Sequence, residues 1–483
     1  MKFRQHLAAV FALSSGAAFA GADLPVVSSC TMVQNSGGRT VTIKYAFEDN
    51  TIPAVVTLDV KTNVTGRATA NESDWVSIGG EHIWNAQGAV WRKVTEADVG
   101  SDGKFTITWD PTYSWTGKDG KGFTVDAARV CVTAWPLDNT PDYMVVDISA
   151  GAEPGTQRYY PSVDFLPGSE PGQKGAVTNN TAYRLTSLLM RKIMAKGITW
   201  TMGSTDQEKL RTAAREGTHQ VTLGNNYYIG VFEITQSQWA QIQLERSAPS
   251  WFSKPGECAM RPVECVSYNE IRNNDGTSRA DDDAYNWPHA PNPKSFLGLL
   301  NARTGLLFDL PSEAQWEFAA RAGNGTTKWG DGSPMQDNNN DSNLAKIGRY
   351  YKNGGETVGN NFGTYGGGLA YGPEAGTAYA GMYLPNDWGL YDMFGNIAEW
   401  CLDYFEENIA AYGGHVNIHP SDGTKYYSGG TPSADVTWGA YRIVRGGGFG
   451  TEASGCRPAS RNNKGQQLRY DIGFRVVCPA GLE

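Results

Sequence analysis

The spacing of apolar residues changes once along this chain, and the change divides the chain into two kinds of predicted structure. Between residues 26 and 149, short runs such as RTVTIKYAF, AVVTLDVKTNV, KFTITWD and ARVCVTAW alternate apolar and polar side chains. Alternation with a period of two is typical of half-buried strands, and Gly, Asn and Asp between the runs indicate turns. No helical period is present in this region. Residues 26–149 therefore predict an antiparallel β-sandwich of immunoglobulin-like size.

From about residue 190 the sequence shows helix starts instead. Three capping boxes are present: TQSQ from Thr235, SYNE from Ser267 and SEAQ from Ser312. In a capping box, a hydroxyl and a Glu or Gln three residues later bond the free N–H groups of a helix's first turn. After Gly323 the sequence becomes rich in glycine, asparagine and aromatic residues, which predicts long ordered loops. We therefore expect an α+β domain over residues 190–483.

The segment between these regions, residues 150–189, is rich in Gly, Pro and Ser and predicts a linker. Across the whole chain, 58 glycines and 15 tryptophans favour a loop-rich fold with aromatic anchors over a helical bundle.

The first twenty residues are typical of a secretory signal peptide. Lys2 and Arg4 form a basic start, an apolar run follows, and Ala18-Phe19-Ala20 is a small-residue cleavage motif. The apolar run is too short to span a bilayer, and no later run is long enough. We therefore expect a protein that is secreted, at the cell surface or periplasmic, cleaved near Ala20, with no transmembrane segment. Its net charge of −9 argues against nucleic acid as a partner.

Export makes disulfides possible, and the chain has seven cysteines. An odd number leaves at least one cysteine outside an intramolecular bridge. No C-x-x-C spacing is present, so the sequence does not indicate a zinc ribbon or a thioredoxin-type site. Cys30 and Cys131 are the only cysteines of the predicted sandwich, and we expect them to pair.

Seven motifs of the second region follow one another in an order that resembles a known family. They lie between residues 199 and 479: TMGS, GVFEITQSQWAQI, RPVECVSYNEI, FDLPSEAQWEFAARAG, GLYDMFGNIAEW, VRGGGF and DIGFRVV. The region is similar to the formylglycine-generating enzyme family, also called the sulfatase-modifying factor family. The resemblance implies a C-type-lectin-like fold for this α+β domain. The resemblance does not extend to the predicted sandwich of residues 26–149.

The family oxidises a cysteine of its substrate to formylglycine with copper(I), which two cysteines five residues apart hold. Soft thiolate ligands select Cu(I). In this sequence the second position is Cys456, but the first is Thr451, whose hydroxyl is a poor copper(I) ligand. The family's neighbouring serine is Gly448 and its tryptophan is Ala398. These departures predict that oxidase activity is absent, and Cys456 has a catalytic role only under the alternative hypothesis that it is present.

The resemblance also suggests a use for the remaining cysteines. Cys401 lies where active relatives usually carry a hydroxyl residue, which favours a Cys401–Cys456 bridge. Cys258 and Cys265, seven residues apart, would then close a local loop. Cys478 would be the odd thiol.

The stretch YDMFGNIAEW matches the family's structural calcium site. The resemblance implies carboxylate ligands from Asp392 and Glu399, and backbone carbonyl ligands from Gly395 and Ile397. Such hard oxygen ligands suit Ca²⁺. The alternative is a glycine turn that carries two solvated acids.

A second calcium site of the family matches less closely. Asn343 and Leu344 fit its first half, while the second half falls near Gly372 and Glu374, where the match is loose.

Two functions follow from these observations. The first is a secreted, sulfatase-modifying-factor-like binding or cell-surface module on a calcium-stabilised fold, whose ligand is an extracellular protein or a glycan. The alternative is a copper-dependent formylglycine-generating oxidase that converts a cysteine of an exported sulfatase-type target. The oxidase needs a free Cys456 and a second copper ligand, for which Cys401 and Cys478 are the nearby options.

Overall fold

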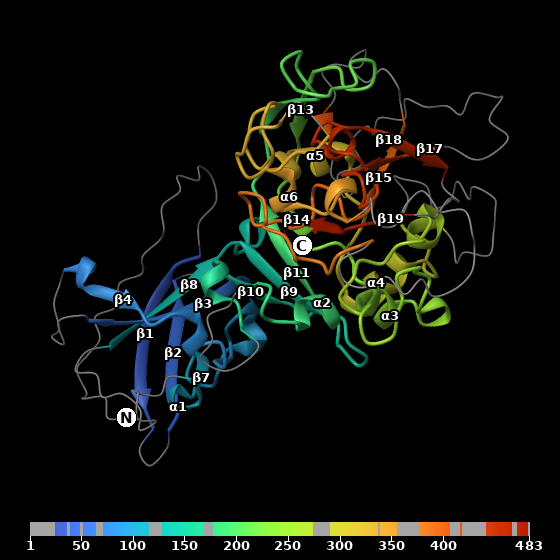
Figure 1. Cartoon of the computed structure of the whole chain (residues 1–483). Coiled ribbons are helices and arrows are strands. Elements are labelled where there is room, and N and C mark those ends of the chain that lie inside the picture. The colour runs from blue at the N-terminus through green and yellow to red at the C-terminus, as the bar shows by residue number, and fades with distance from the viewer. Residues whose placement is uncertain are drawn as a thin grey trace. The chain divides into compact units, whose positions relative to one another are not determined.

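The computed structural model of the chain divides it into two units (Figure 1). Unit 1 comprises Met1–Val145, Gln157–Ala182 and Gly481–Glu483, and unit 2 comprises Val146–Thr156 and Tyr183–Ala480. Residues described by the structure are 25–35, 39–48, 52–63, 71–114, 128–168, 177–273, 290–336, 339–354, 376–405, 416–417, 441–465 and 471–481.

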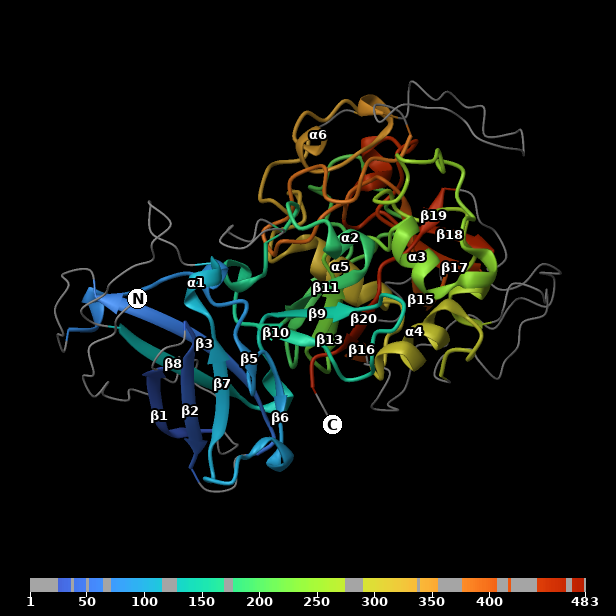
Figure 2. The same cartoon turned by 90° about the horizontal axis from the view of Figure 1, so that it is seen from below.

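Unit 1 contains two antiparallel sheets (Figure 2). The first has the order β1 (Val27–Gln34), β2 (Val41–Phe47), β7 (Phe105–Trp109), β5 (Gln87–Gly88). In the second, β3 (Ala54–Asn63) pairs with β4 (Trp75–Ser77), β6 (Arg92–Val94) and β8 (Ala128–Trp135). The four strands predicted from alternation are β2, β3, β7 and β8. On β2 the alternation is direct, because Val41, Ile43 and Tyr45 are fully buried while the residues between them are half-buried.

The segment expected to be a linker contains regular structure. Residues 150–189 include β10 (Arg158–Tyr160), α2 (Ala182–Leu185) and the start of β11 (Ser187–Ile193). Strand β10 pairs with β9 (Tyr143–Asp147), and Tyr159 and Tyr160 are buried. The glycines and prolines that indicated a linker are therefore interspersed with short elements whose aromatic residues are buried.

Unit 2 is built on short sheets. Strand β14 (Tyr227–Gly230) pairs with β11 and β20 (Val477–Pro479). Strand β13 (His219–Leu223) pairs with β12 (Thr199–Met202) and, in parallel, with β16 (Val416–Asn417). The third sheet has the order β18 (Asn462–Gly465), β17 (Tyr441–Arg445), β15 (Ala398–Tyr404), β19 (Ile472–Gly473).

The helices of unit 2 begin where the capping boxes predict. Thr235 caps α3 (Gln236–Ile242) and Ser312 caps α5 (Glu313–Arg321), each with both reciprocal hydrogen bonds. At Ser267 the reciprocal bonds with Glu270 also form, but the turn that follows, Asn269–Asn273, is a π-helix. Two further helices of this unit are α4 (Phe296–Thr304) and the four-residue α6 (Leu344–Ile347).

Helix α5 is buried on all sides. The sequence places Trp316, Ala319 and Ala320 on one apolar face, and these residues are in the main hydrophobic core of unit 2. The charged residues Glu313, Glu317 and Arg321 are buried as well. Buried charges need partners of opposite charge, and those of these three residues are described with the candidate site.

No helix among the described residues has the length and apolar character needed to cross a membrane. The predicted signal peptide, residues 1–20, lies outside the described residues.

Candidate functional site

The glycine turn that follows β17 packs closely on its surroundings. Gly446 and Gly447 have φ values of 84° and 67°, in the left-handed region that favours glycine. A Cβ on Gly446 would lie 3.1 Å from the Trp316 ring, and one on Gly447 would lie 2.9 Å from Cys456 Sγ. The glycines therefore allow the backbone to pass directly over α5 and over the short helix η12 (Ala453–Cys456).

Thr451, at the first copper-ligand position of the family, has a structural role in this turn. Its Oγ1 accepts a hydrogen bond of 2.9 Å from the Gly448 N–H, and its own N–H donates to the Gly448 carbonyl at 2.9 Å. The hydroxyl closes the turn, and a neutral oxygen is in any case a poor ligand for copper(I).

Cys456, at the second copper-ligand position, is fully buried. It belongs to the main core of unit 2 together with Ile443 and Ala453. Burial raises the pKa of the Cys456 thiol far above its usual range, and the positive charge of Arg457 offsets this only in part. Sγ lies 3.9 Å from the Thr451 carbonyl, at the limit of a weak S–H hydrogen bond. Because the thiolate is the reactive and metal-binding form, a neutral buried thiol is inert.

The structure corrects the predicted disulfides. All seven cysteines lie in the described part of the chain and all are free thiols. The bridges expected for Cys30–Cys131, Cys258–Cys265 and Cys401–Cys456 are therefore not formed. Cys401, on β15, and Cys456 are both fully buried in the core of unit 2, where a reduced cysteine packs as a small apolar side chain. Cys478, expected to be the single odd thiol, is one of seven.

The acids of the predicted calcium site are buried, which excludes the alternative of two solvated acids. Asp392 and Glu399 are each 1% exposed. Asp392 Oδ2 accepts a hydrogen bond of 2.7 Å from the Gly381 N–H, whereas the buried Oδ1 has no hydrogen-bond partner. Burial raises the pKa of Asp392 to about 6.

Glu399 is already paired. Arg475 donates two hydrogen bonds to its carboxylate, from Nε to Oε2 at 2.7 Å and from Nη2 to Oε1 at 2.6 Å. The Trp316 Nε1–H donates to Oε2 at 2.8 Å. The carboxylate therefore has a counter-charge from the protein itself.

Gly395 and Ile397 lie in the turn between these acids. Gly395 has a φ of 103°, and a Cβ there would lie 2.1 Å from the Arg349 carbonyl oxygen, so a larger residue cannot be accommodated. The Ile397 N–H donates to Glu233 Oε1 at 3.2 Å.

Glu233 is a third buried acid that the sequence analysis missed. Asn396 Nδ2 donates to its Oε2 at 2.6 Å. Burial, reinforced by the neighbouring charges of Asp392 and Glu399, raises the pKa of Glu233 well above its usual range. Its only sequence signal is a carboxylate inside the apolar run GVFEI.

The donor set at this turn fits a calcium ion only in part. Asp392 Oδ1 is buried without a hydrogen-bond partner and could bind a cation. The Glu399 carboxylate, however, is already hydrogen-bonded to Arg475. Across the described ranges, no group of three or more His, Cys, Asp or Glu side chains is arranged to hold a metal ion.

Asn343 and Leu344, the weaker calcium candidates, lie at the start of α6. Asp341 Oδ1 accepts hydrogen bonds from both of their N–H groups, at 2.8 and 3.1 Å. Asn343 Oδ1 accepts from Lys346 Nζ at 3.1 Å, and the Leu344 side chain is fully buried. Gly372 and Glu374, the expected remainder of the site, lie outside the described residues.

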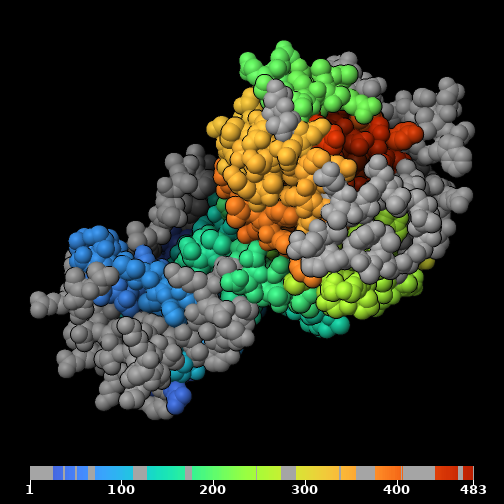
Figure 3. All heavy atoms as spheres, viewed as in Figure 1, coloured from blue at the N-terminus to red at the C-terminus, as the bar shows by residue number. Residues whose placement is uncertain are grey.

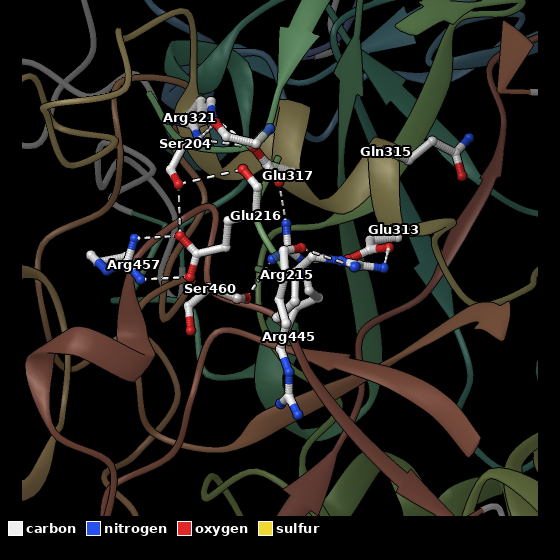
Figure 4. Close-up of polar contacts among 12 residues, drawn as sticks. Ser204, Arg215, Glu216, Glu313, Gln315, Glu317, Arg321, Arg445, Arg457 and Ser460 are labelled. Atoms are coloured by element: carbon white, nitrogen blue, oxygen red, sulfur yellow. Dashed lines mark hydrogen bonds and ion pairs between the residues drawn. The ribbon is translucent and has the colours of Figure 1, made fainter. Parts of the chain in front are cut away.

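A buried network of charged side chains surrounds α5 and the segment after Cys456 (Figure 4). Arg461 Nε and Nη2 donate to Glu313 at 2.6 and 2.9 Å, and Arg321 Nε donates to Glu317 at 2.9 Å. Arg445 also donates to Glu317. The remaining members are Glu208, Glu216 and Arg457. Each charged side chain of α5 therefore has a partner of opposite charge.

A family model described as the sulfatase-modifying factor enzyme 1-like domain matches residues 185–480. The chain belongs to this family. It is 31% identical over 179 residues to a formylglycine-generating enzyme of Streptomyces coelicolor, a match that covers 36% of this chain and 47% of the relative.

A second relative is the chaperone protein LppX of Paenibacillus barcinonensis, which is 30% identical over 273 residues, covering 53% of this chain and 81% of the relative. Among solved structures, Treponema denticola variable protein 1 aligns with a TM-score of 0.41 and 23% identity, covering 61% of this chain and 96% of that chain. The chain spans about half the length of the curated formylglycine-generating enzyme from Streptomyces coelicolor that it matches.

Proposed function

We propose that this protein is an exported binding or cell-surface module that retains the fold of its family without oxidase activity. The observation that carries the proposal is the state of the two copper-ligand positions. The Thr451 hydroxyl is bonded within the turn, and the Cys456 thiol is fully buried, which raises its pKa. Neither group supplies an exposed thiolate, which copper(I) chemistry requires.

Two further observations support a binding role. One relative that shares most of its length with this chain, LppX, is named a chaperone and not an oxidase. Unit 1 contains two antiparallel sheets, which fits an immunoglobulin-like sandwich that presents unit 2 to an extracellular protein or glycan.

Copper(I) titration of the mature protein against a competing chelator tests the proposal. We expect binding far weaker than that of a family member with two cysteines, because one buried thiol cannot hold the ion. The Thr451→Cys variant is the informative companion, and we expect that it also gains no turnover, because Gly448 and Ala398 lack the family's hydroxyl and aromatic ring. Tight stoichiometric binding by the wild-type protein at Cys456 would overturn the proposal.

The alternative function, a formylglycine-generating oxidase, has one observation in its favour: Cys456 is reduced. Incubation with copper and a peptide that contains C-x-P-x-R tests it directly, with the mass of the peptide as the readout. Conversion that depends on copper and is lost in Cys456→Ser would establish the oxidase instead.

Calcium binding at the Asp392 turn is proposed as an addition to either function. The unpartnered Oδ1 of Asp392 supports a calcium site at this turn. Because Glu399 is paired with Arg475, the proposed site does not use Glu399 as a free ligand.

A further inference from the structure

Residues 203–218, which we call the strap, join β12 to β13 on the surface of unit 2 (Figure 1 and Figure 3). The buried side chains of the strap are all polar: Ser204, Glu208 and Glu216. Its one leucine, Leu210, is only half-buried. A segment that buries no apolar side chain gains little from the hydrophobic effect. The strap is therefore held in place by polar and ionic contacts.

The central contact of the strap is with Arg457. Glu216 accepts two hydrogen bonds from the Arg457 guanidinium, at 2.7 and 2.9 Å, and Glu208 Oε1 accepts a third at 2.6 Å. Ser204 Oγ also donates to Glu216, at 2.8 Å (Figure 4). Paired hydrogen bonds between an arginine and carboxylates fix both distance and orientation.

Arg457 links the strap to the buried thiol. It directly follows Cys456, the last residue of η12, and its Nε donates to the Ser454 carbonyl within η12 at 2.9 Å. The same guanidinium therefore holds the strap on one side and η12 on the other. Displacement of this guanidinium would break its contacts with the strap and with η12 together.

The two ends of the strap have separate attachments. Arg321 Nη2 donates to the Gly203 carbonyl at 2.8 Å, and Arg461 Nη1 donates to the Arg215 carbonyl at 3.0 Å. Loss of a carboxylate at Arg457 leaves both of these contacts in place. The loss of the Glu216 carboxylate, one residue beyond the Arg215 attachment, would loosen the strap without removing these two attachments.

We propose that the strap is a gate for the Cys456 thiol. While Glu208 and Glu216 hold Arg457, η12 is closed and Sγ is fully buried. Removal of the Glu216 carboxylate leaves the buried Arg457 with Glu208 as its one remaining carboxylate in this contact, which favours the open arrangement. The strap and η12 then open together as a local unit, and small thiol reagents reach Cys456 while the strands of unit 2 remain folded.

Alkylation of the whole mature protein with N-ethylmaleimide, followed by peptide mass analysis, tests the gate. In Glu216→Gln we expect the labelling rate of Cys456 to rise at least about tenfold at the same pH. Cys401 on β15 and Cys478 on β20 report on the remaining fold, and their rates should not change. The matched control is Asp206→Asn, also in the strap, whose side chain is 95% exposed. Its ion pair is with Arg211, within the strap, and not with Arg457, so this variant should label like wild type.

Two results would overturn the gate. One is an unchanged rate at Cys456 in Glu216→Gln, and the other is an equal rise at all three cysteines, which means general unfolding. If Glu216→Gln does not fold, hydrogen exchange of the wild-type protein decides instead. The amides of the strap and η12 should exchange at a common rate that is faster than that of β15. Strap amides as slow as those of β15 would contradict the proposal.

Discussion

At the scale of single residues, the environment of a side chain decides its chemistry. Thr451 and Cys456 lie at positions that hold copper in the family, yet one closes a turn and the other packs in the core. Glu208 shows how the environment of a side chain also changes its pKa. Burial raises its pKa from the ordinary 4.5 to about 7, although Arg321 and Arg457 are both near.

The raised pKa of Glu208 predicts a pH dependence. Because the folded state holds the proton more tightly than the unfolded state, Glu208 favours folding at low pH, and this contribution is lost as the pH rises from about 4.5 to about 7. We expect Glu208→Gln to lose this dependence. Free energies of unfolding at about pH 5 and about pH 8, measured for both proteins, check it. A variant that declines in parallel with the wild type would show that other groups are responsible.

The pairing of Glu399 predicts a large stability effect. Glu399→Gln leaves the fully buried Arg475 without its carboxylate, and breaking such a pair costs about 3–5 kcal/mol. We expect that loss in urea unfolding both with calcium and with a chelator. The pair Lys44–Asp102, in which both side chains are 41% exposed, provides the control, since Asp102→Asn should cost far less. A small effect of Glu399→Gln would mean that the pair contributes little in solution.

At the scale of elements, capping residues and turns place the side chains of the candidate site. Thr235 and Ser312 start α3 and α5 with the predicted reciprocal bonds, and α5 brings Trp316 and Glu317 beneath the glycine turn. Asp392 lies in a turn with a φ of 57°, which directs its carboxylate into the interior. An unpartnered buried oxygen there is the reason to expect a cation.

Calcium binding at this turn should appear as added stability. A ligand at a hundredfold excess over its Kd stabilises the folded state by about 2.7 kcal/mol, which raises the melting temperature by several degrees. We expect calcium to produce this rise in the wild-type protein and not in Asp392→Ala. Asp331→Ala, in a partly buried turn of the same unit, should respond like wild type. Equal melting temperatures with calcium and with chelator would rule out the site.

At the scale of the whole molecule, the chain combines a β-sheet unit with a unit of the sulfatase-modifying factor family. The basic start, short apolar run and Ala18-Phe19-Ala20 motif are typical of a signal peptide, which predicts export of this pair of units.

Export predicts a defined mature N-terminus. Expressed with its first twenty residues in a bacterium, the protein should be recovered outside the cytoplasm and begin at Gly21. Ala18→Asp, which disrupts the small-residue motif, should accumulate as the uncleaved precursor. An N-terminus at Met1 in the exported wild-type protein would contradict the signal peptide.

The sequence by itself determined the elements and the family. Alternation in residues 41–47 and 54–63 predicted β2 and β3, and the capping boxes predicted the starts of α3 and α5, because these signals depend on bonds between residues a few positions apart. Seven ordered motifs were sufficient to identify the family.

Only the tertiary structure decided which charged side chains are paired and which cysteine thiols are buried. Glu399 meets Arg475 from 76 residues away, and Glu216 meets Arg457 from 241 residues away. No local pattern encodes such contacts. The linker was expected from its Gly, Pro and Ser content and the three disulfides from the positions of the cysteines and the family resemblance, while two solvated acids were the alternative to a calcium site. Each was decided by burial instead, because the free energy of a charge or a thiol depends on what the folded chain packs against it.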